Sequence, residues 1–221
     1  MPADLATLLA GKFVVFDGPD GCGKSTQLQM LVARLEEQGA KVRRLREPGG
    51  TAIGDQIRKL LLSPEHDDMD VHCEMLLYMA SRAQLVHEQI QPALSSRECV
   101  LSDRFASSTL AYQGGGGGMD LQQILEVAES AVNNHWPHLT LVFDLEIDQA
   151  MARLNPLLSD TAGLFQDRIE QRNRDYFQRV RQNYLWQVKQ WPERYRIIDA
   201  SKTVPAVEKQ VLKTLTDFFS A

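Results

Sequence analysis

The chain has 221 residues, of which 43% are hydrophobic and 24% charged, a balance typical of one soluble globular domain. Lys and Arg number 24 against 29 Asp and Glu, and the resulting net charge of −5 argues against binding a nucleic-acid polymer. Cys22, Cys73 and Cys99 have neither the C-x-x-C spacing of a zinc site nor the density of a disulfide framework. The first eleven residues lack an early positive charge, and no apolar run approaches the roughly 20 residues of a membrane span. We therefore expect a cytoplasmic protein without a membrane segment.

Short apolar runs alternate with helical patterns along the chain. Five runs are expected as strands, at residues 12–17, 41–46, 99–102, 140–144 and 195–199. Between the first two, Leu28, Leu31, Val32 and Leu35 fall at the i, i+3, i+4, i+7 spacing of a helix face. This alternation predicts an α/β fold with a five-stranded parallel sheet, covered by helices on both faces. In such sheets, ligands bind at the carboxyl ends of the strands.

A glycine-rich loop follows the first expected strand. Residues 18–25 read Gly-Pro-Asp-Gly-Cys-Gly-Lys-Ser, the G-x-x-x-x-G-K-[ST] pattern, and a helical pattern begins near Thr26. Its backbone N–H groups can surround phosphate oxygens, while Lys24 can reach the outer phosphates and the Ser25 hydroxyl can bind Mg²⁺. An ordinary turn that caps a helix is the alternative, and the strand–loop–helix context weighs against it. The loop predicts binding of a nucleoside triphosphate with Mg²⁺ through Gly18, Gly21, Cys22, Gly23, Lys24, Ser25 and Thr26.

Two further loops follow the second and third expected strands. Residues 46–51 read Arg-Glu-Pro-Gly-Gly-Thr, and Arg46 could aim its guanidinium at a phosphate, although a surface turn explains this string equally well. Asp103 directly follows the third expected strand, where a carboxylate can hold the water shell of a metal ion, and Arg104 beside it can bind a phosphate. A structural ion pair is the alternative for these two neighbours. We also expect two mobile elements, residues 113–119 with five consecutive glycines and residues 155–166.

Residues 101–113 carry the most specific pattern. They contain an Asp-Arg-aromatic string, a serine three positions beyond it, and Ala-Tyr-Gln at the end. In this pattern, in residues 46–51 and in the order of the strands, the chain resembles the thymidylate kinases, which phosphorylate dTMP to dTDP. The resemblance runs from about Lys12 to the C-terminus. It implies a single P-loop kinase domain over residues 1–221 with a lid at approximately 153–168, ATP as co-substrate, Mg²⁺, and a homodimer.

The resemblance also implies roles for side chains around the sugar and phosphate of dTMP. Asp20 would accept a hydrogen bond from the 3′-hydroxyl group. Arg46 and Arg104 would hold the phosphate. Tyr112 would crowd the 2′ position and so favour deoxyribose by steric exclusion.

Around the base, the resemblance implies an aromatic stack and several polar contacts. Tyr78 would stack on thymine, and Arg82, one helical turn further on, would hydrogen-bond a base carbonyl. A cation–π contact on a surface helix is the alternative for this pair. Ser108 and Gln113 would line the base pocket, and the glycine run would form a flexible flap over the nucleoside.

For catalysis, the resemblance implies charge neutralisation by Lys24, Arg104 and the metal held at Ser25 and Asp103. The family adds one more arginine, either in the phosphate loop, where this chain has Gly21, or in the lid. Residues 155–166 contain no Lys or Arg. We therefore expect Arg153 or Arg168, which flank this segment, to reach the γ-phosphate, or else turnover to be slow.

Cys22 is interpreted as a small loop residue rather than a nucleophile. Because a helix N-terminus lowers the pKa of a thiol, we expect its pKa to be lowered and its alkylation to block ATP binding.

Two other functions stay open at this point. The absence of Lys and Arg from the lid segment favours a nucleotide-binding protein that has lost turnover. The intact phosphate loop, with Asp103 and Arg104, weighs against that function. A kinase for another nucleoside monophosphate keeps the same chemistry, but Tyr78, Arg82 and Tyr112 argue against it.

Overall fold

The computed structural model of the protein describes residues 4–159, 168–169 and 172–220. Five strands form one all-parallel sheet in the order β2-β3-β1-β4-β5. The strands are β1 (Phe13–Asp17), β2 (Val42–Arg46), β3 (Cys99–Asp103), β4 (Leu139–Asp144) and β5 (Tyr195–Asp199). The five predicted strands are confirmed, each to within one residue at either end, because each is a short apolar run bounded by polar or glycine-rich residues.

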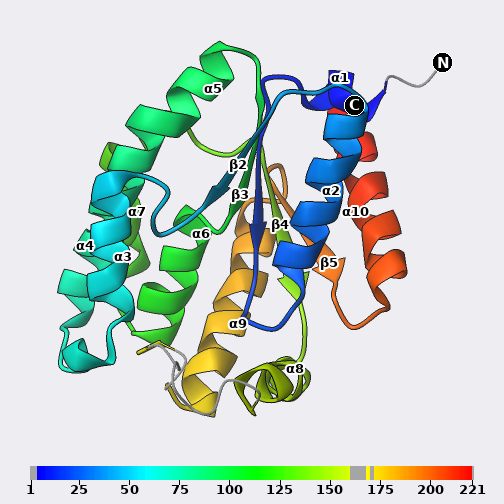
Figure 1. Ribbon diagram of the computed structural model, residues 1–221. Coiled ribbons are helices and arrows are strands. Elements are labelled where there is room, and N and C mark those ends of the chain that lie inside the picture. Colours follow the sequence, from blue (N-terminus) through cyan, green and yellow to red (C-terminus); the bar gives the residue numbers. More distant parts are fainter. Residues whose placement is uncertain (1–3, 160–167, 170–171, 221) are drawn as a thin grey trace.

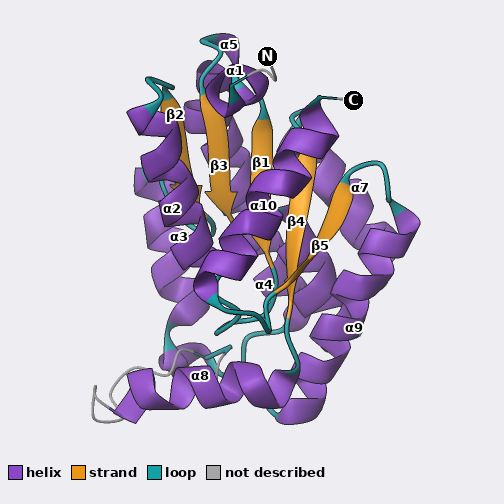
Figure 2. Ribbon diagram, turned by 90° about the vertical axis from the view of Figure 1, so that its right-hand side faces the viewer, coloured by secondary structure: helices purple, strands orange, loops and turns teal. Residues whose placement is uncertain are grey.

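Helices cover both faces of the sheet, as the alternating pattern predicts (Figure 1). On one side lie α1 (Leu5–Leu9), α2 (Lys24–Glu37) and α10 (Val204–Phe219). The other side holds α3 (Ala52–Leu62), η1 (Pro64–His66), α4 (Val71–Leu85), η2 (Val86–Ile90), α5 (Gln91–Ser95), α6 (Ala106–Thr109), η3 (Leu110–Gly116), α7 (Leu121–Val132) and α9 (Arg174–Gln190). Helix α8 (Ile147–Ser159) lies across the carboxyl end of the sheet, at the bottom of Figure 2.

The residues of strand β1 explain why helices pack on both faces of the sheet. All five of these residues are buried. Because side chains alternate along a strand, Val14 and Phe16 pack in the cluster beneath α2 and α10, whereas Phe13 and Val15 pack in the cluster beneath η2 and α5. A strand with two apolar faces is stable only between two helical layers. Among the described residues, none of the helices has the length and apolarity that crossing a bilayer requires.

The glycine run is not a flexible flap, and that prediction is wrong. Residues Leu110–Gly116 form a π-helix that continues α6. The glycines permit a close approach of α9, because a Cβ placed on Gly115 would lie 2.5 Å from Cβ of Asn183, and one on Gly116 would lie 2.6 Å from the ring of Tyr176. The run is therefore a packed helix whose missing side chains make room for its neighbour.

The second segment expected to be irregular, residues 155–166, begins inside α8, which extends to Ser159. The rest of that segment lies outside the described residues.

Candidate active site

The phosphate loop joins β1 to α2 at the carboxyl end of the sheet. Gly18, Gly21 and Gly23 have φ angles of 139°, 77° and 85°, a backbone region that favours glycine. The last of them is the N-cap of α2, which begins at Lys24. The Lys24 ammonium donates to the Pro19 carbonyl at 3.3 Å. The loop therefore directs the N-terminus of a long helix and one cation toward the same space, an arrangement suited to phosphates.

The two residues predicted to hold a metal lie together. The Ser25 hydroxyl, in the first turn of α2, donates to Oδ2 of Asp103 at 2.5 Å. Both are oxygen ligands, and Mg²⁺ prefers a small number of protein oxygens supplemented by water and substrate phosphates. The donor set therefore fits Mg²⁺.

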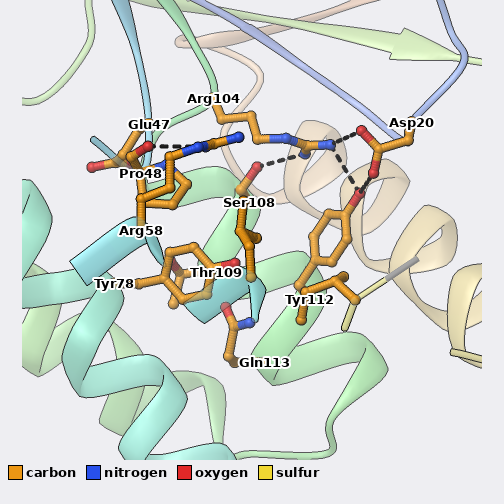
Figure 3. A pocket seen from close by; sticks show the side chains of 12 residues that line it. Asp20, Glu47, Pro48, Arg58, Tyr78, Arg104, Ser108, Thr109, Tyr112 and Gln113 are labelled. Atoms are coloured by element: carbon orange, nitrogen blue, oxygen red, sulfur yellow. Dashed lines mark hydrogen bonds and ion pairs between the residues drawn. The ribbon is translucent and has the colours of Figure 1, made fainter. Parts of the chain in front are cut away.

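Arg104 connects the phosphate loop to the neighbouring cavity. Its backbone φ is 72°, and its guanidinium donates to Oδ1 of Asp20 at 2.6 Å, to the Tyr112 hydroxyl at 3.1 Å and to the Ser108 hydroxyl at 3.0 Å. Figure 3 shows these three partners around one guanidinium. Burial by itself raises the pKa of Asp20, but the charges of Arg104 and Lys24 outweigh it and hold that pKa well below its usual range.

Asp17 anchors this cluster, and the sequence reading did not identify it. The side chain is fully buried at the end of β1 and accepts hydrogen bonds from the hydroxyls of Ser107, Ser108 and Tyr184. Nη1 of Arg104 lies 3.5 Å from it. Burial raises the pKa of Tyr184, so this hydroxyl stays a donor. The signal that could have identified Asp17 is an acidic residue at the last position of an otherwise apolar strand.

A cavity of about 180 Å³ extends from Arg104 toward α4. Asp20, Arg104, Ser108 and Tyr112 line the end beside the phosphate loop. Tyr78, Thr109 and Gln113 lie together on the side away from Asp20 (Figure 3), and the lining also includes Pro48, Leu62 and Ile169. The cavity therefore has a cationic, hydroxyl-rich end and an end with an aromatic ring and an amide, which suits a nucleoside monophosphate.

Comparisons with known proteins agree with this geometry. A family model described as thymidylate kinase matches residues 16–211. The thymidylate kinase of an Exiguobacterium species is 45% identical over 204 residues, covering 92% of this chain and 93% of that protein. The chain belongs to the thymidylate kinase family. The thymidylate kinase of Ectopseudomonas mendocina is 40% identical over 213 residues, 96% of this chain and 99% of its own length. Among solved structures, the thymidylate kinase from Ehrlichia chaffeensis aligns with a TM-score of 0.73 and 29% identity, covering 92% of this chain and 97% of that one.

Arg82, which the family resemblance assigns to the base, is fully buried behind the cavity wall. It donates two hydrogen bonds to Oε2 and Oε1 of Glu47, at 2.6 and 2.8 Å, and one to the Thr109 hydroxyl at 3.0 Å. Its guanidinium also lies 5.2 Å from the ring centroid of Phe105. Burial raises the pKa of Glu47 and the Arg82 charge opposes that rise. Arg82 holds two residues of the cavity wall, and its contact with a base carbonyl stays a prediction.

Arg46 is exposed at the end of β2, and its guanidinium has no hydrogen-bond or ion-pair partner within the described part of the chain. Arg58 of α3 lines the cavity and donates to the Pro48 carbonyl at 3.0 Å. The sequence reading did not identify Arg58, because an arginine on an amphipathic helix has no local pattern that distinguishes it from a surface residue.

The two arginines that flank the lid segment differ in their surroundings. Arg153 is exposed on α8. Arg168 is 3% exposed and donates to a carboxylate oxygen of Glu74 and to the Leu61 carbonyl, while its Nη1 has no hydrogen-bond partner among the described residues. Reaching a phosphate would require Arg168 to leave a buried ion pair, which is strongly unfavourable.

Helix α8 packs directly on the phosphate loop at Gly21. A Cβ on Gly21 would lie 2.5 Å from the Ala150 carbonyl oxygen and 3.1 Å from Cγ of Leu154. The position where some family members have an arginine therefore has no room for a side chain in this chain.

The environment of Cys22 contradicts the predicted pKa of its thiol. The Cys22 side chain is 2% exposed and packs in the apolar cluster with Leu28 and Phe143. Burial raises the pKa of Cys22, so the predicted lowering of its pKa is wrong. The helix N-terminus stabilises a thiolate only when the sulfur faces the phosphate side, and here the sulfur faces the core.

Proposed function

We propose that this chain transfers the γ-phosphoryl group of ATP to dTMP, giving ADP and dTDP, with Mg²⁺ held at Ser25 and Asp103. The observation that carries the proposal is the position of Arg104. It bonds Asp20 of the phosphate loop while lining a cavity that ends at Tyr78 and Gln113. The names of the relatives support the same reaction.

On the ATP side, the backbone N–H groups of residues 18–26 would hold the phosphates, and Lys24 would contact the outer ones. Lys24 is nine-tenths buried and lies 3.4 Å from Oδ1 of Asp20. A bound phosphate would replace these weak partners with stronger ones. Mg²⁺ would neutralise charge on the β- and γ-phosphates when bound.

On the dTMP side, the phosphate would lie against Arg104 with Arg46 as a second cation, and the sugar would contact Asp20. The Tyr112 hydroxyl donates to Oδ2 of Asp20 at 3.2 Å, which fixes the ring beside the sugar position and supports exclusion of a 2′-hydroxyl. The base would stack on Tyr78 beside Gln113, while Arg82 would support the wall behind it and Ser108 would serve the phosphate end beside Arg104. This alignment would bring the attacking oxygen and the γ-phosphorus together, which is most of what phosphoryl transfer requires.

We assign the additional transition-state arginine to Arg153. Ala150 and Leu154 of α8 face Gly21. Arg153 lies between them in the chain, three residues after Ala150 and directly before Leu154. A helix places such a residue beside that face. Arg168 is engaged with Glu74 and therefore holds the lid end rather than the phosphate.

We further propose a homodimer formed through α3 and α4. Ile53, Leu60 and Leu76 expose 54%, 47% and 55% of their surface on these helices, which lie side by side at the left of Figure 1. Exposed large apolar side chains on adjacent elements are typical of an interface. Sedimentation equilibrium tests this, with Leu60→Glu expected to give monomers. A single species at the monomer mass of 24.9 kDa for the unmodified chain would contradict it.

We assign the activity to the cytoplasm. Cys22, Cys73 and Cys99 are all free thiols, and Cys73 is exposed. An exposed free thiol is typical of a reducing compartment.

The test is ADP release from ATP and Mg²⁺ with dTMP, dUMP, dCMP, dGMP or no acceptor. We expect turnover that depends on dTMP and is abolished by EDTA. ADP release at the same rate without an acceptor would indicate an ATPase. Binding of both nucleotides without ADP release would indicate a binding protein.

A further inference from the structure

Glu74 lies behind Gln113, one of the residues that line the cavity. It belongs to α4, one helical turn before Tyr78, and is 2% exposed. Nε2 of Gln113 donates to Oε1 of Glu74 at 2.6 Å. The side chain that contacts the cavity is therefore held by a buried carboxylate that does not line it.

Arg168 holds Glu74 from the other side. Its guanidinium donates to Oε2 of Glu74, and its Nε donates to the Leu61 carbonyl at 3.2 Å, which fixes the guanidinium in place. A guanidinium has donors and no acceptor. The carboxylate consequently acts as an acceptor toward both neighbours.

This arrangement determines which way the Gln113 amide points. An amide has a donor end and an acceptor end, and only the NH₂ group can face an accepting carboxylate. The carbonyl oxygen must then point away from Glu74. In Figure 3 the Gln113 amide lies in the cavity beside Tyr78 and Thr109.

An acceptor in this position distinguishes pyrimidines by the atom at position 3. Thymine and uracil carry an N–H there, whereas N3 of cytosine is a bare acceptor. A buried carbonyl oxygen facing a second acceptor is left without a hydrogen bond and is destabilised. A free amide could rotate and accept either base, but an amide held by Glu74 cannot.

We propose that Glu74 is a specificity-determining residue: with Arg168 behind it, it fixes the Gln113 amide so that the site selects bases with an N–H at position 3. This inference rests on the proposed function and deepens it, since it explains how the base end of the cavity excludes dCMP.

The test is Glu74→Gln, measured as the ratio of kcat/KM for dTMP to kcat/KM for dCMP. A glutamine at position 74 can donate as well as accept, so Gln113 can rotate. We expect the ratio to fall at least ~10-fold, because cytosine is rejected when the Gln113 carbonyl oxygen is left without a hydrogen bond. Glu74→Asp keeps an accepting carboxylate and should keep the ratio, even if absolute rates fall. An unchanged ratio in a folded, active Glu74→Gln variant would overturn the proposal.

The Gln113→Ala background separates an effect on the amide from a general structural effect. Without the amide, Glu74→Gln has nothing to reorient, so the ratio should not change further. A tenfold change that persists in this background would show that Glu74 acts by another route and would also overturn the proposal.

A measurement on the unmodified chain covers the case in which Glu74→Gln fails to fold. The 3-deaza analogue of dTMP has C–H in place of N3–H, and its Kd should exceed that of dTMP by at least ~10-fold. Equal Kd values would mean that Gln113 does not offer its oxygen to position 3. Failure of the proposed function is distinguishable, because the unmodified chain would then show no dTMP-dependent release of ADP at all.

Discussion

The hydroxyl of Ser25 and a carboxylate oxygen of Asp103 lie 2.5 Å apart, although 78 residues separate them in the chain. The first belongs to the helix after β1 and the second ends β3, and these strands are hydrogen-bonded neighbours. The parallel sheet therefore brings together the two residues that separate motifs predict to bind the metal.

Asp103→Asn is expected to lower kcat by about 100-fold or more, since it removes the charge that we propose holds Mg²⁺ near the transferring group. Titration of activity with Mg²⁺ should show a higher half-saturating concentration. Asp144→Asn is the matched control, because Asp144 also ends a strand but accepts its hydrogen bonds from Arg181. Equal Mg²⁺ dependence in the two variants would contradict the metal assignment.

Arg153→Ala and Arg168→Ala should have different effects. We expect Arg153→Ala to reduce kcat by about 10³-fold or more with little change in stability or in the Kd of dTMP. Arg168→Ala should lower the free energy of unfolding by about 3–5 kcal/mol, because it leaves Glu74 buried without its cationic partner.

Pre-steady-state kinetics and urea unfolding measure the two quantities. Arg174→Ala removes another arginine beside α8, one whose ion pair with Asp148 is exposed, and serves as the control. A kcat unaffected by Arg153→Ala would remove Arg153 from the mechanism.

Gly115→Ala tests whether the glycine run is a packed helix. In an exposed helix this change stabilises by about 1 kcal/mol, but here the new methyl group would lie 2.5 Å from Cβ of Asn183. We therefore expect a loss of about 1–3 kcal/mol in thermal or urea unfolding. Combining it with Asn183→Gly, which removes the clashing atom, should cost less than the sum of the two single changes. A stabilising Gly115→Ala would contradict close packing against α9.

Thiol labelling of the folded chain should modify Cys73 first. Cys73 is exposed, whereas Cys22 and Cys99 are buried, and burial raises the pKa of Cys22 and raises that of Cys99 to about 12. Modification of Cys73 alone should leave ATP binding unchanged, as isothermal titration would measure. Rapid labelling of Cys22 at pH 7 would contradict its burial.

The same pKa shifts predict a decline in stability at high pH. A thiol whose pKa is raised on folding contributes stability that is fully present below its unfolded pKa, near 9, and is lost as the pH rises through the folded value. Cys99→Ala should therefore flatten the dependence of unfolding free energy on pH above about 9. An unchanged slope would mean that this thiol is not the cause.

The strands and the phosphate loop could be predicted because each has a local signal. Apolar runs such as residues 13–17 are short and bounded, and the pattern at 18–25 fixes the loop and the helix after it. Tyr78 and Gln113 were found only through the family resemblance, yet they line the same cavity.

The buried polar network could not be predicted from local patterns. Asp17 meets Tyr184 across 167 residues, and Glu74 meets Arg168 across 94, so neither pair leaves a short-range trace. The glycine run was misread for a similar reason. Its composition favours a loop, but packing against α9 overrides that preference. The direction of the Cys22 pKa shift was also mispredicted, because only the folded chain shows that the sulfur points into the core.

The most direct test of the central claim is ³¹P NMR of the protein with equimolar ATP, dTMP and Mg²⁺. Transfer of the γ-phosphoryl group predicts that the dTMP resonance falls as the two doublets of dTDP appear, while ADP forms in equal amount at the expense of ATP and little inorganic phosphate forms. An unchanged dTMP resonance, with ATP either intact or hydrolysed to ADP and inorganic phosphate, would contradict the account.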